Sequence, residues 1–206
     1  MKVLLVNSSP NTHGCTYTAL TEISTQLEKS GIETELFQLG TKTVSGCRGC
    51  WQCAKLGRCV IDDTVNILGE KVKKADGYIF GSPVYFAGIS GQLKSLMDRL
   101  MCAYGPHMRF KPTAAVASAR RAGTTPTLDD INRFFALNDM LIVTSQYWNE
   151  VHGSTPEEVK KDEEGMQIMR SLARNMAWTL RCLEAGKQAG VPLPEEEPGI
   201  RTDFIR

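Results

Sequence analysis

Four cysteines lie close together in one short stretch of this 206-residue chain, GCRGCWQCAKLGRCV at residues 46–60. They follow the pattern C-x2-C-x2-C-x5-C and are Cys47, Cys50, Cys53 and Cys59. Three thiolates at such regular spacing can surround one centre, and the longer interval lets the fourth return from the far side, close to the spacing that holds iron-sulfur clusters. Structural zinc more often uses two separated C-x-x-C hairpins, and free or redox-active thiols are the remaining interpretation.

A second stretch that could do chemistry opens the chain, MKVLLVNSSPNTHGCTYTAL at residues 1–20. The apolar run at residues 3–6 predicts a short buried strand, residues 7–11 break it, and a helical pattern begins near Cys15 and Thr16. A loop of small residues before a helix presents backbone N–H groups and hydroxyls at the positive end of the helix dipole, which suits a phosphate. A Ser-rich turn that only caps the helix is the alternative.

The kind of phosphate follows from what this loop lacks. Neither G-x-x-x-x-G-K-[ST] nor G-x-G-x-x-G occurs in it. The hydroxyl-rich loop instead suits a terminal monophosphate, held by Ser9, Thr16 and several amides without an obligatory metal.

Bulk composition predicts one domain over residues 1–206, with a Cys-rich loop at 46–60 and a C-terminal extension at 190–206. The formal net charge of +1 gives no reason to expect nucleic acid or a membrane surface as a partner. Apolar runs are strand-sized, and no transmembrane helix or signal peptide is expected. Seven cysteines without a secretory signal favour reduced thiols or a metal centre in the cytoplasm. Cys15, Cys102 and Cys182 are expected to be small buried hydrophobes.

The elements that must position these loops alternate along the chain. Strand-like runs at residues 33–39, 77–84, 113–119 and 140–144 follow the first strand, and helical patterns lie between them. A long helix is predicted at residues 155–185. This alternation predicts an α/β fold with a doubly wound, five-stranded parallel sheet covered on both faces.

Ligands of such sheets bind outside the carboxyl ends of the strands, where the strand order reverses. Three loops are expected there, at residues 8–16, 83–88 and 119–124. In the second, Tyr85 and Phe86 directly follow a buried strand, and a planar heteroaromatic ligand would cover their rings. A place in the core or at a subunit interface is the alternative.

All three loops resemble one family. The first is similar to the S-P-R-x-x-G-N-T loop of flavodoxin-like FMN proteins, with Asn11 and Cys15 in place of the usual basic residue and amide. GSPVYFAGISGQLKSLMDR at residues 81–99 resembles the flavin-ring loop and following helix of NAD(P)H-dependent FMN reductases, and SARRAG at residues 118–123 occupies the corresponding next loop. The resemblance implies a flavodoxin-like, three-layer α/β/α fold and an FMN site formed by Ser9, Asn11, Gly14, Cys15, Thr16, Pro83, Val84, Tyr85, Phe86, Ala119, Arg120 and Gly123.

An arginine in the third loop would have a chemical use. Reduction of a flavin builds negative charge at its pyrimidine end, and a guanidinium such as that of Arg120 favours this charge in a poorly solvated site. The alternative is that Arg120 and Arg121 are ordinary surface charges.

The cysteine run is similar to the compact motif of the iron-sulfur flavoproteins, which carry FMN and a 4Fe-4S cluster. NMAWTLRCLE at residues 175–184 and the TDFIR ending also resemble this group. The resemblance implies an FMN-dependent oxidoreductase whose partner is NADH, NADPH or a ferredoxin-type electron carrier, in a homodimer or homotetramer. The flavin does the chemistry, so no catalytic acid or base is assigned. A passive flavodoxin-like electron carrier and a quinone or nitro-compound reductase are the alternatives.

Overall fold

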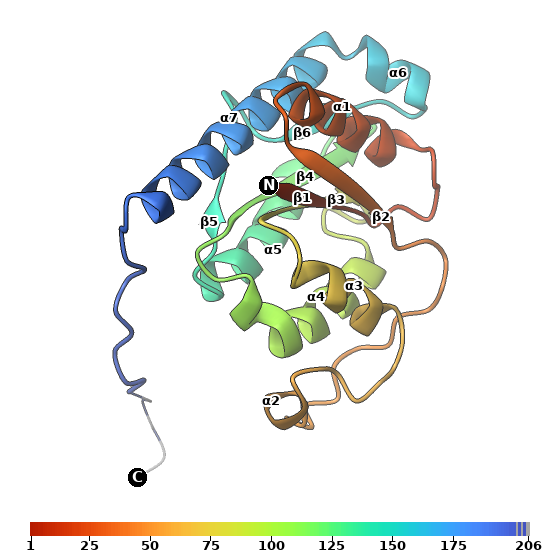
Figure 1. Ribbon diagram of the computed structural model, residues 1–206. Coiled ribbons are helices and arrows are strands. Elements are labelled where there is room, and N and C mark those ends of the chain that lie inside the picture. Colours follow the sequence, from red (N-terminus) through yellow and green to blue (C-terminus); the bar gives the residue numbers. More distant parts are fainter. Residues whose placement is uncertain (201, 203, 205–206) are drawn as a thin grey trace.

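A parallel sheet forms the centre of the computed structural model, which describes residues 1–200, 202 and 204 (Figure 1). Its strand order is β2-β1-β3-β4-β5, with β6 also paired to β4. The strands are β1 Lys2–Asn7, β2 Glu33–Gln38, β3 Gly77–Pro83, β4 Pro112–Ala119, β5 Leu141–Ile142 and β6 Glu150–His152. All pairs are parallel. The doubly wound fold predicted from the sequence is confirmed.

The fifth position in the sheet differs from the single strand predicted at residues 140–144. There β5 pairs with the start of β4, at Pro112 and Thr113, and β6 pairs with its end, at residues 117–119. The chain leaves the sheet between the two strands and returns to it, and Ala117 N–H donates to Asn149 O at the return. The polar residues that follow the apolar run gave no strand signal, so the sequence did not reveal β6.

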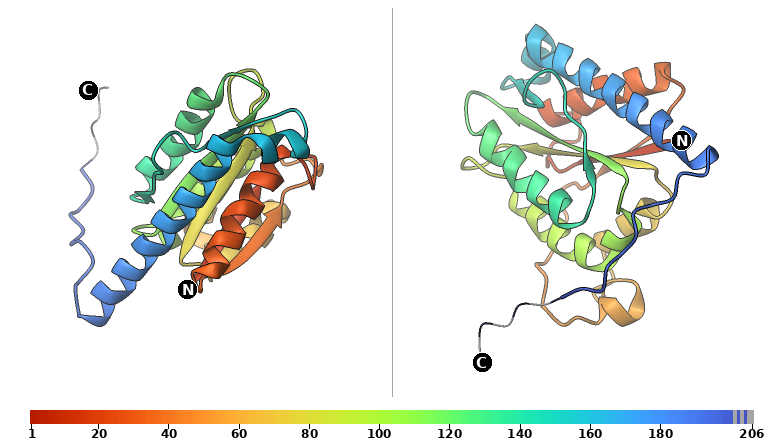
Figure 2. Two further views of the ribbon diagram at one scale, coloured as in Figure 1. Left: turned by 90° about the horizontal axis from the view of Figure 1, so that it is seen from above. Right: turned by 90° about the vertical axis from the view of Figure 1, so that its left-hand side faces the viewer.

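Helices cover both faces of the sheet (Figure 2). They are α1 Cys15–Lys29, α2 Cys53–Leu56, α3 Thr64–Val72, α4 Gly91–Tyr104, α5 Thr124–Leu137, α6 Pro156–Lys161 and α7 Glu163–Gln188, with a 3-10 turn η1 at Gly105–His107. In β1, Leu4 and Val6 pack with α3, α4 and α5, whereas Val3 and Leu5 pack with α1 and α7. Successive strand residues face opposite sides, so a continuous apolar run fills both layers.

The long helix predicted at residues 155–185 is wrong at one point, because Asp162 divides it into α6 and α7. Asp162 has ψ 81°, outside the helical region. Its carboxylate accepts hydrogen bonds from Gly165 N–H at 2.9 Å and from His152 N–H at 2.6 Å. Aspartate favours such capping positions over helix interiors, so α7 begins with its own cap.

The C-terminal segment follows α7 (Figure 1), and Glu196 within it pairs with Arg109, just after η1. Residues 191–200 form neither helix nor strand. Of the TDFIR ending noted in the sequence, Asp203, Ile205 and Arg206 lie outside the described residues. In the part of the chain that the structure describes, every helix is too short or too polar to span a bilayer.

Candidate functional site

The three loops expected at the carboxyl edge of the sheet contact one another. Thr16 Oγ, at the start of α1, lies 2.7 Å from Ser118 Oγ at the end of β4. Val84 N–H donates to Ser118 O at 2.9 Å, and Ser90 Oγ donates to Ser8 Oγ at 3.3 Å. The loop that follows β3 is thereby joined to both other loops, and one site can be built from all three.

The first loop offers backbone groups rather than free hydroxyls. Ser9 is buried, and its Oγ accepts from Asn11 N–H at 3.1 Å. Gly14 is the N-cap of α1, and no side chain of the described residues caps this helix. A side chain at Gly14 would place its Cβ 2.9 Å from Asn11 Cβ, so glycine keeps the loop tight. The first turn of this 15-residue helix has no side-chain cap, which is the feature that the predicted anion-binding element requires.

Two side chains assigned to this loop from the sequence already have partners. Thr16 is 1% exposed, and its hydroxyl bonds Ser118, as described above. The Cys15 thiol donates to Gly153 O at 3.5 Å, and burial raises the pKa of this thiol. Gly153 N–H in turn donates to Ala119 O at 2.9 Å. The segment after β6 is therefore a fourth part of this edge, which the sequence missed together with β6.

The second loop holds two residues in the left-handed backbone region. Tyr85 and Gly88 exchange backbone hydrogen bonds of 3.0 Å in both directions, and between them Phe86 has φ 50° and Ala87 has φ 58°. This is the geometry of a tight hairpin turn that normally carries Gly or Asn at these positions. Phe86 is fully exposed and Tyr85 is 47% exposed, so the alternative that placed both rings in the core is wrong. Strain of this kind concentrates at functional sites.

The third loop rests on the second through Gly123. Gly123 has φ +91°, and a Cβ added to it would lie 2.8 Å from Val84 Cγ1 and 2.9 Å from Ala87 Cα. The close approach therefore depends on the missing side chain. Arg120 and Arg121 are exposed on the same loop.

A separate pocket brings the cysteine run together with helix α4. Its lining includes all four cysteines of the run, namely Cys47, Cys50, Cys53 and Cys59, and also Cys102 of α4. The pocket has a volume of about 50 Å³, several times the roughly 10–15 Å³ that one water molecule needs. Cys102 and Cys182 are exposed, so the expectation that both are buried hydrophobes is wrong, while Cys15 is half-buried.

The backbone of the run turns sharply around Cys50. Gly49 has φ 63° and Trp51 has φ 57°, and Gly49 N–H donates to Cys47 Sγ at 3.5 Å. Across the described ranges, no three His, Cys, Asp or Glu side chains stand close enough to hold a single metal ion. Thiolates that bind a multinuclear cluster surround a larger group than those around one tetrahedral ion. The four thiols thus line one pocket without converging on a single point.

Cys59 is the most firmly held of these cysteines, because Asn66 of α3 bonds its backbone. Asn66 Oδ1 accepts from Cys59 N–H at 3.0 Å, and Asn66 Nδ2 donates to Cys59 O at 2.9 Å. The amide also accepts from the Tyr104 hydroxyl at 3.1 Å. Asn66 is 5% exposed and fixes the segment as a neighbouring strand would.

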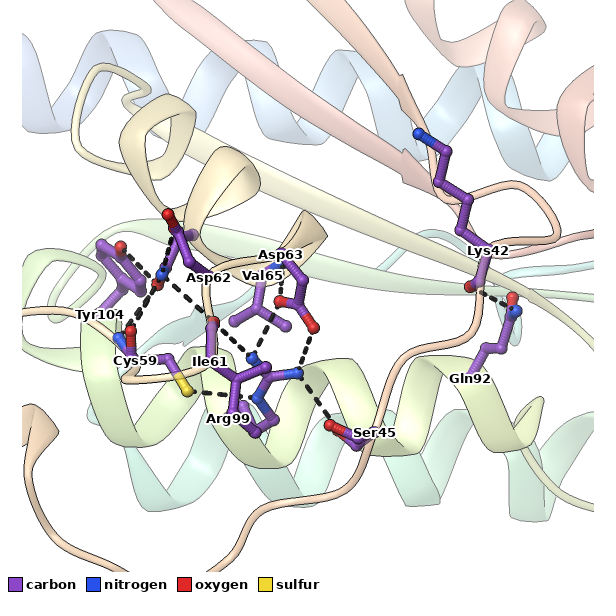
Figure 3. Close-up of polar contacts among 11 residues, drawn as sticks. Lys42, Ser45, Cys59, Ile61, Asp62, Asp63, Val65, Gln92, Arg99 and Tyr104 are labelled. Carbon is purple, nitrogen blue, oxygen red and sulfur yellow. Dashed lines mark hydrogen bonds and ion pairs between the residues drawn. The ribbon is translucent and has the colours of Figure 1, made fainter.

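Arg99 of α4 fixes the sulfur of the same cysteine. Arg99 is 2% exposed, and its Nε–H donates to Cys59 Sγ at 3.3 Å. Its two terminal nitrogens bond Asp63 at 2.7 and 2.9 Å. They also donate to Ser45 O at 3.3 Å and Ile61 O at 3.0 Å. One buried guanidinium therefore holds both ends of the cysteine loop (Figure 3).

This ion pair stays charged despite its burial. Burial alone would raise the pKa of Asp63, but the hydrogen bonds from Arg99 and Val65 N–H hold it below its usual range. Burial alone would lower the pKa of Arg99, but the hydrogen bonds to Asp63 and Cys59 hold it above its usual range. Asp63 also caps α3, by accepting from Val65 N–H at 3.0 Å.

Arg99, Asn66 and Cys102 are site residues that the sequence did not reveal as such. A signal for Arg99 existed, because this charged residue lies between Leu96 and Leu100 on the buried face of α4. Buried arginines are almost always paired. Its partner Asp63 is 36 residues away, and only the fold brings the two together.

Solved structures share the fold of this chain, and curated relatives share much of its sequence. RosB, whose crystal structure holds 8-demethyl-8-formylriboflavin-5'-phosphate, shares the fold with a TM-score of 0.69 and 15% identity, over 100% of this chain and 96% of that one. A curated iron-sulfur flavoprotein of Methanocaldococcus jannaschii is 34% identical over 192 residues, which cover 89% of this chain and 100% of the relative. Another, from Archaeoglobus fulgidus, is 32% identical over 179 residues, or 80% of this chain and 90% of the relative.

The model of one protein family, described as NADPH-dependent FMN reductase, matches residues 1–155. This range includes the three converging loops and the whole cysteine run. Three quarters of the chain thus match the family, and the curated relatives extend the similarity into α7. The chain therefore belongs to the NADPH-dependent FMN reductase family, in the group of iron-sulfur flavoproteins.

Proposed function

We propose that the three loops at the carboxyl edge hold FMN, and that the four cysteines of the run hold a 4Fe-4S cluster. Family membership makes the chain an FMN-dependent oxidoreductase. The proposal adds where each cofactor binds and that NADH, NADPH or a ferredoxin-type carrier exchanges electrons with the protein. When bound, FMN supplies two-electron chemistry and the cluster supplies one-electron transfer. The observation that carries the proposal is the contact of all three loops at one edge.

Each loop has its own part in holding FMN. The first turn of α1 and the tight loop before it offer N–H groups to the phosphate. The second loop presents exposed aromatic rings and backbone groups to the isoalloxazine, and the third borders its pyrimidine end. The proposed residues are Ser9, Asn11, Gly14, Cys15 and Thr16 for the phosphate, Pro83, Val84, Tyr85 and Phe86 for the ring, and Ala119, Arg120 and Gly123 for the pyrimidine end.

Arg120 has a specific role in this proposal. Its exposed guanidinium is free to lie over the pyrimidine end, where it would favour the negative charge of the reduced ring. Backbone N–H groups of the second and third loops would donate hydrogen bonds to the ring and hold its orientation.

Replacing Phe86 with glycine separates stability from flavin binding. The ring is fully exposed and the residue is left-handed, so Phe86→Gly is expected to raise the free energy of unfolding by about 0.5–1 kcal/mol. FMN affinity is expected to fall about tenfold, because one aromatic contact is lost. Urea denaturation of the apoprotein and FMN fluorescence titration measure the two effects.

Ala87→Gly is the matched control, since it relieves the same backbone strain at the next residue without removing a ring. It is expected to stabilise the protein and leave FMN affinity unchanged. Equal FMN affinity in Phe86→Gly and wild type would show that Phe86 does not contact the flavin.

The residues of the cysteine pocket fit an iron-sulfur cluster. Four thiols of the proposed set line one pocket, and N–H groups of Gly49 and Arg99 already point at two of the sulfurs. Thiolates are the ligands that such clusters require, and hydrogen bonds to the sulfurs tune them. Cys47, Cys50, Cys53 and Cys59 are therefore proposed as the ligands. All seven cysteines are free thiols, which suits the reducing cytoplasm proposed as the location.

Steady-state oxidation of NADH and NADPH with an artificial acceptor tests the proposed activity. The anaerobically purified protein is expected to consume one of the two nucleotides continuously. A passive electron carrier would instead react only with a reduced ferredoxin and would show no steady turnover. The near-neutral net charge of +1 disfavours such a carrier, because carriers depend on complementary charged surfaces.

A homodimer or homotetramer is the expected assembly. Phe86 is fully exposed beside the proposed flavin site, where a second subunit can cover it. Light scattering during size-exclusion chromatography with FMN present should give a mass of at least twice the 22.8 kDa of one chain. A monodisperse monomer under these conditions would contradict the prediction.

A further inference from the structure

Arg99 is the largest of the fully buried side chains that the structure describes, and its role is not explained by packing alone. Its two terminal nitrogens form a bidentate pair with Asp63, the strongest geometry available to a guanidinium. The Nε–H remains, and the fold directs it at the sulfur of Cys59 rather than at an oxygen. A thiol is a weak acceptor, whereas a metal-bound thiolate carries negative charge and accepts well.

We propose that Arg99 is a positioning residue for the cluster: it holds the Cys59 sulfur in place and, together with Asp63, sets how readily the cluster takes up an electron. This inference rests on the proposed function, because it requires Cys59 to be a cluster ligand. It assigns a role to two residues outside the cysteine motif.

Hydrogen bonds from two neighbouring helices hold Cys59 in a fixed position. Asn66 bonds both backbone groups of Cys59, and Arg99 bonds its sulfur, so backbone and side chain are fixed together. Arg99 also bonds Ser45 O and Ile61 O, which lie on opposite sides of the cysteine run in sequence. Cys47 and Cys50, in contrast, lie exposed on the loop. Cys59 is therefore the most firmly preorganised of the four proposed ligands.

The charges of Arg99 and Asp63 would affect how readily a bound cluster takes up an electron. If a cluster is bound, one electron supplied by reduced FMN would add one negative charge to it and would break no bond of the protein. The Nε–H dipole points toward that charge and favours it. The positive charge of Arg99 is nearly cancelled by Asp63, whose carboxylate lies 2.7 Å from it. The net electrostatic field at the Cys59 sulfur therefore depends on the charges of both Arg99 and Asp63.

Two substitutions should move the reduction potential in opposite directions. Asp63→Asn keeps an N-cap for α3, since asparagine caps as well as aspartate, and leaves the charge of Arg99 uncompensated. Its one-electron reduction constant is expected to rise about tenfold, which is about 59 mV for one electron. Arg99→Met removes the donor and leaves the charge of Asp63, so the same constant is expected to fall by a similar factor. The double variant restores neutrality without the donor and should lie between them.

The measurement is an anaerobic redox titration of the purified holoprotein, followed by visible and EPR spectroscopy, with iron and sulfide content determined for each variant. The midpoint of FMN in the same sample is an internal reference that should not move. Glu70→Gln is the matched control, because it removes a carboxylate from the exposed face of α3, where Glu70 pairs with Lys73. Its cluster midpoint should equal that of wild type.

The experiment distinguishes a failure of the proposed role of Arg99 from a failure of the proposed cluster. Opposite shifts in Asp63→Asn and Arg99→Met, with the control unchanged, support the inference. If Arg99→Met loses iron while the control retains it, the positioning role is supported and the shift in Asp63→Asn decides the electrostatic role. Iron-loaded variants with unchanged midpoints would overturn the inference and leave the proposed cluster intact. A wild-type protein that contains FMN but no iron would overturn the cluster itself, and this role with it.

Discussion

Replacing Cys50 with alanine is expected to abolish iron binding and to leave the full complement of FMN in place. Cys50 lies exposed in the loop between two left-handed residues, so its loss removes no core packing and the fold should persist. A cluster that requires four thiolates is left with three. The proposed flavin loops belong to the carboxyl edge of the sheet and share no residue with the cysteine pocket. Iron, sulfide and FMN analysis of anaerobically purified protein measures the result.

Two cysteine variants control this experiment. Cys182→Ala changes an exposed thiol of α7 and should leave iron unchanged. Cys102→Ala removes the fifth thiol of the same pocket and should also leave iron unchanged, because Cys102 is not part of the spaced run. Wild-type iron content in Cys50→Ala would defeat the assignment. Loss of iron in Cys102→Ala would show that the ligand set was chosen wrongly.

Gly123→Ala is expected to lower FMN affinity by at least about tenfold and to destabilise the protein by about 2–5 kcal/mol. At φ +91° an alanine is strained, and its Cβ would lie within 3 Å of Val84 and Ala87. A left-handed alanine costs roughly 1–2 kcal/mol and overpacking typically 1–3 kcal/mol. The second loop must move to relieve the contact, so the proposed ring site loses its shape.

Gly31→Ala is the control that introduces the same left-handed backbone strain without a steric clash. Gly31 has φ +73°, but an added Cβ would meet no described atom within 4 Å. This variant should lose only roughly 1–2 kcal/mol of stability and retain wild-type FMN affinity. FMN fluorescence titration and urea denaturation compare the two. Wild-type FMN affinity in Gly123→Ala would contradict the placement of the flavin between the second and third loops.

Helix α4 connects the two proposed cofactor sites. Its N-cap, Ser90, bonds Ser8 in the first loop, while Arg99 and Cys102 line the cysteine pocket. Nine residues separate Ser90 from Arg99, which corresponds to roughly 14 Å along a helix. One rigid element therefore carries a contact to each site, and it follows directly after the loop proposed to hold the flavin ring.

The sheet could be predicted because its strands are buried on both faces. Val3 and Leu5 face one layer while Leu4 and Val6 face the other, so the run reads as continuously apolar. The positions of the loops followed from the strands. The break at Asp162 was missed, because a single aspartate in a helical pattern does not reveal that it will accept from His152 on a neighbouring strand.

The candidate site was predictable only where its residues are local in sequence. The spacing of the cysteine run was enough to indicate a common pocket, and the four thiols do line one. Arg99 and Cys102 join it from α4, about 40 residues further along, and no local pattern encodes that contact. The left-handed turn at Phe86 was equally invisible, because its residue types are not those that such turns favour.

The most direct test of the central claim is the cofactor content of the protein purified without oxygen, measured by its visible spectrum together with FMN, iron and sulfide analysis. The proposal predicts a coloured protein with FMN, and with about four iron and four sulfide atoms per chain as a 4Fe-4S cluster requires. A colourless protein that also refuses added FMN at high concentration would contradict the claim that the three loops bind a flavin.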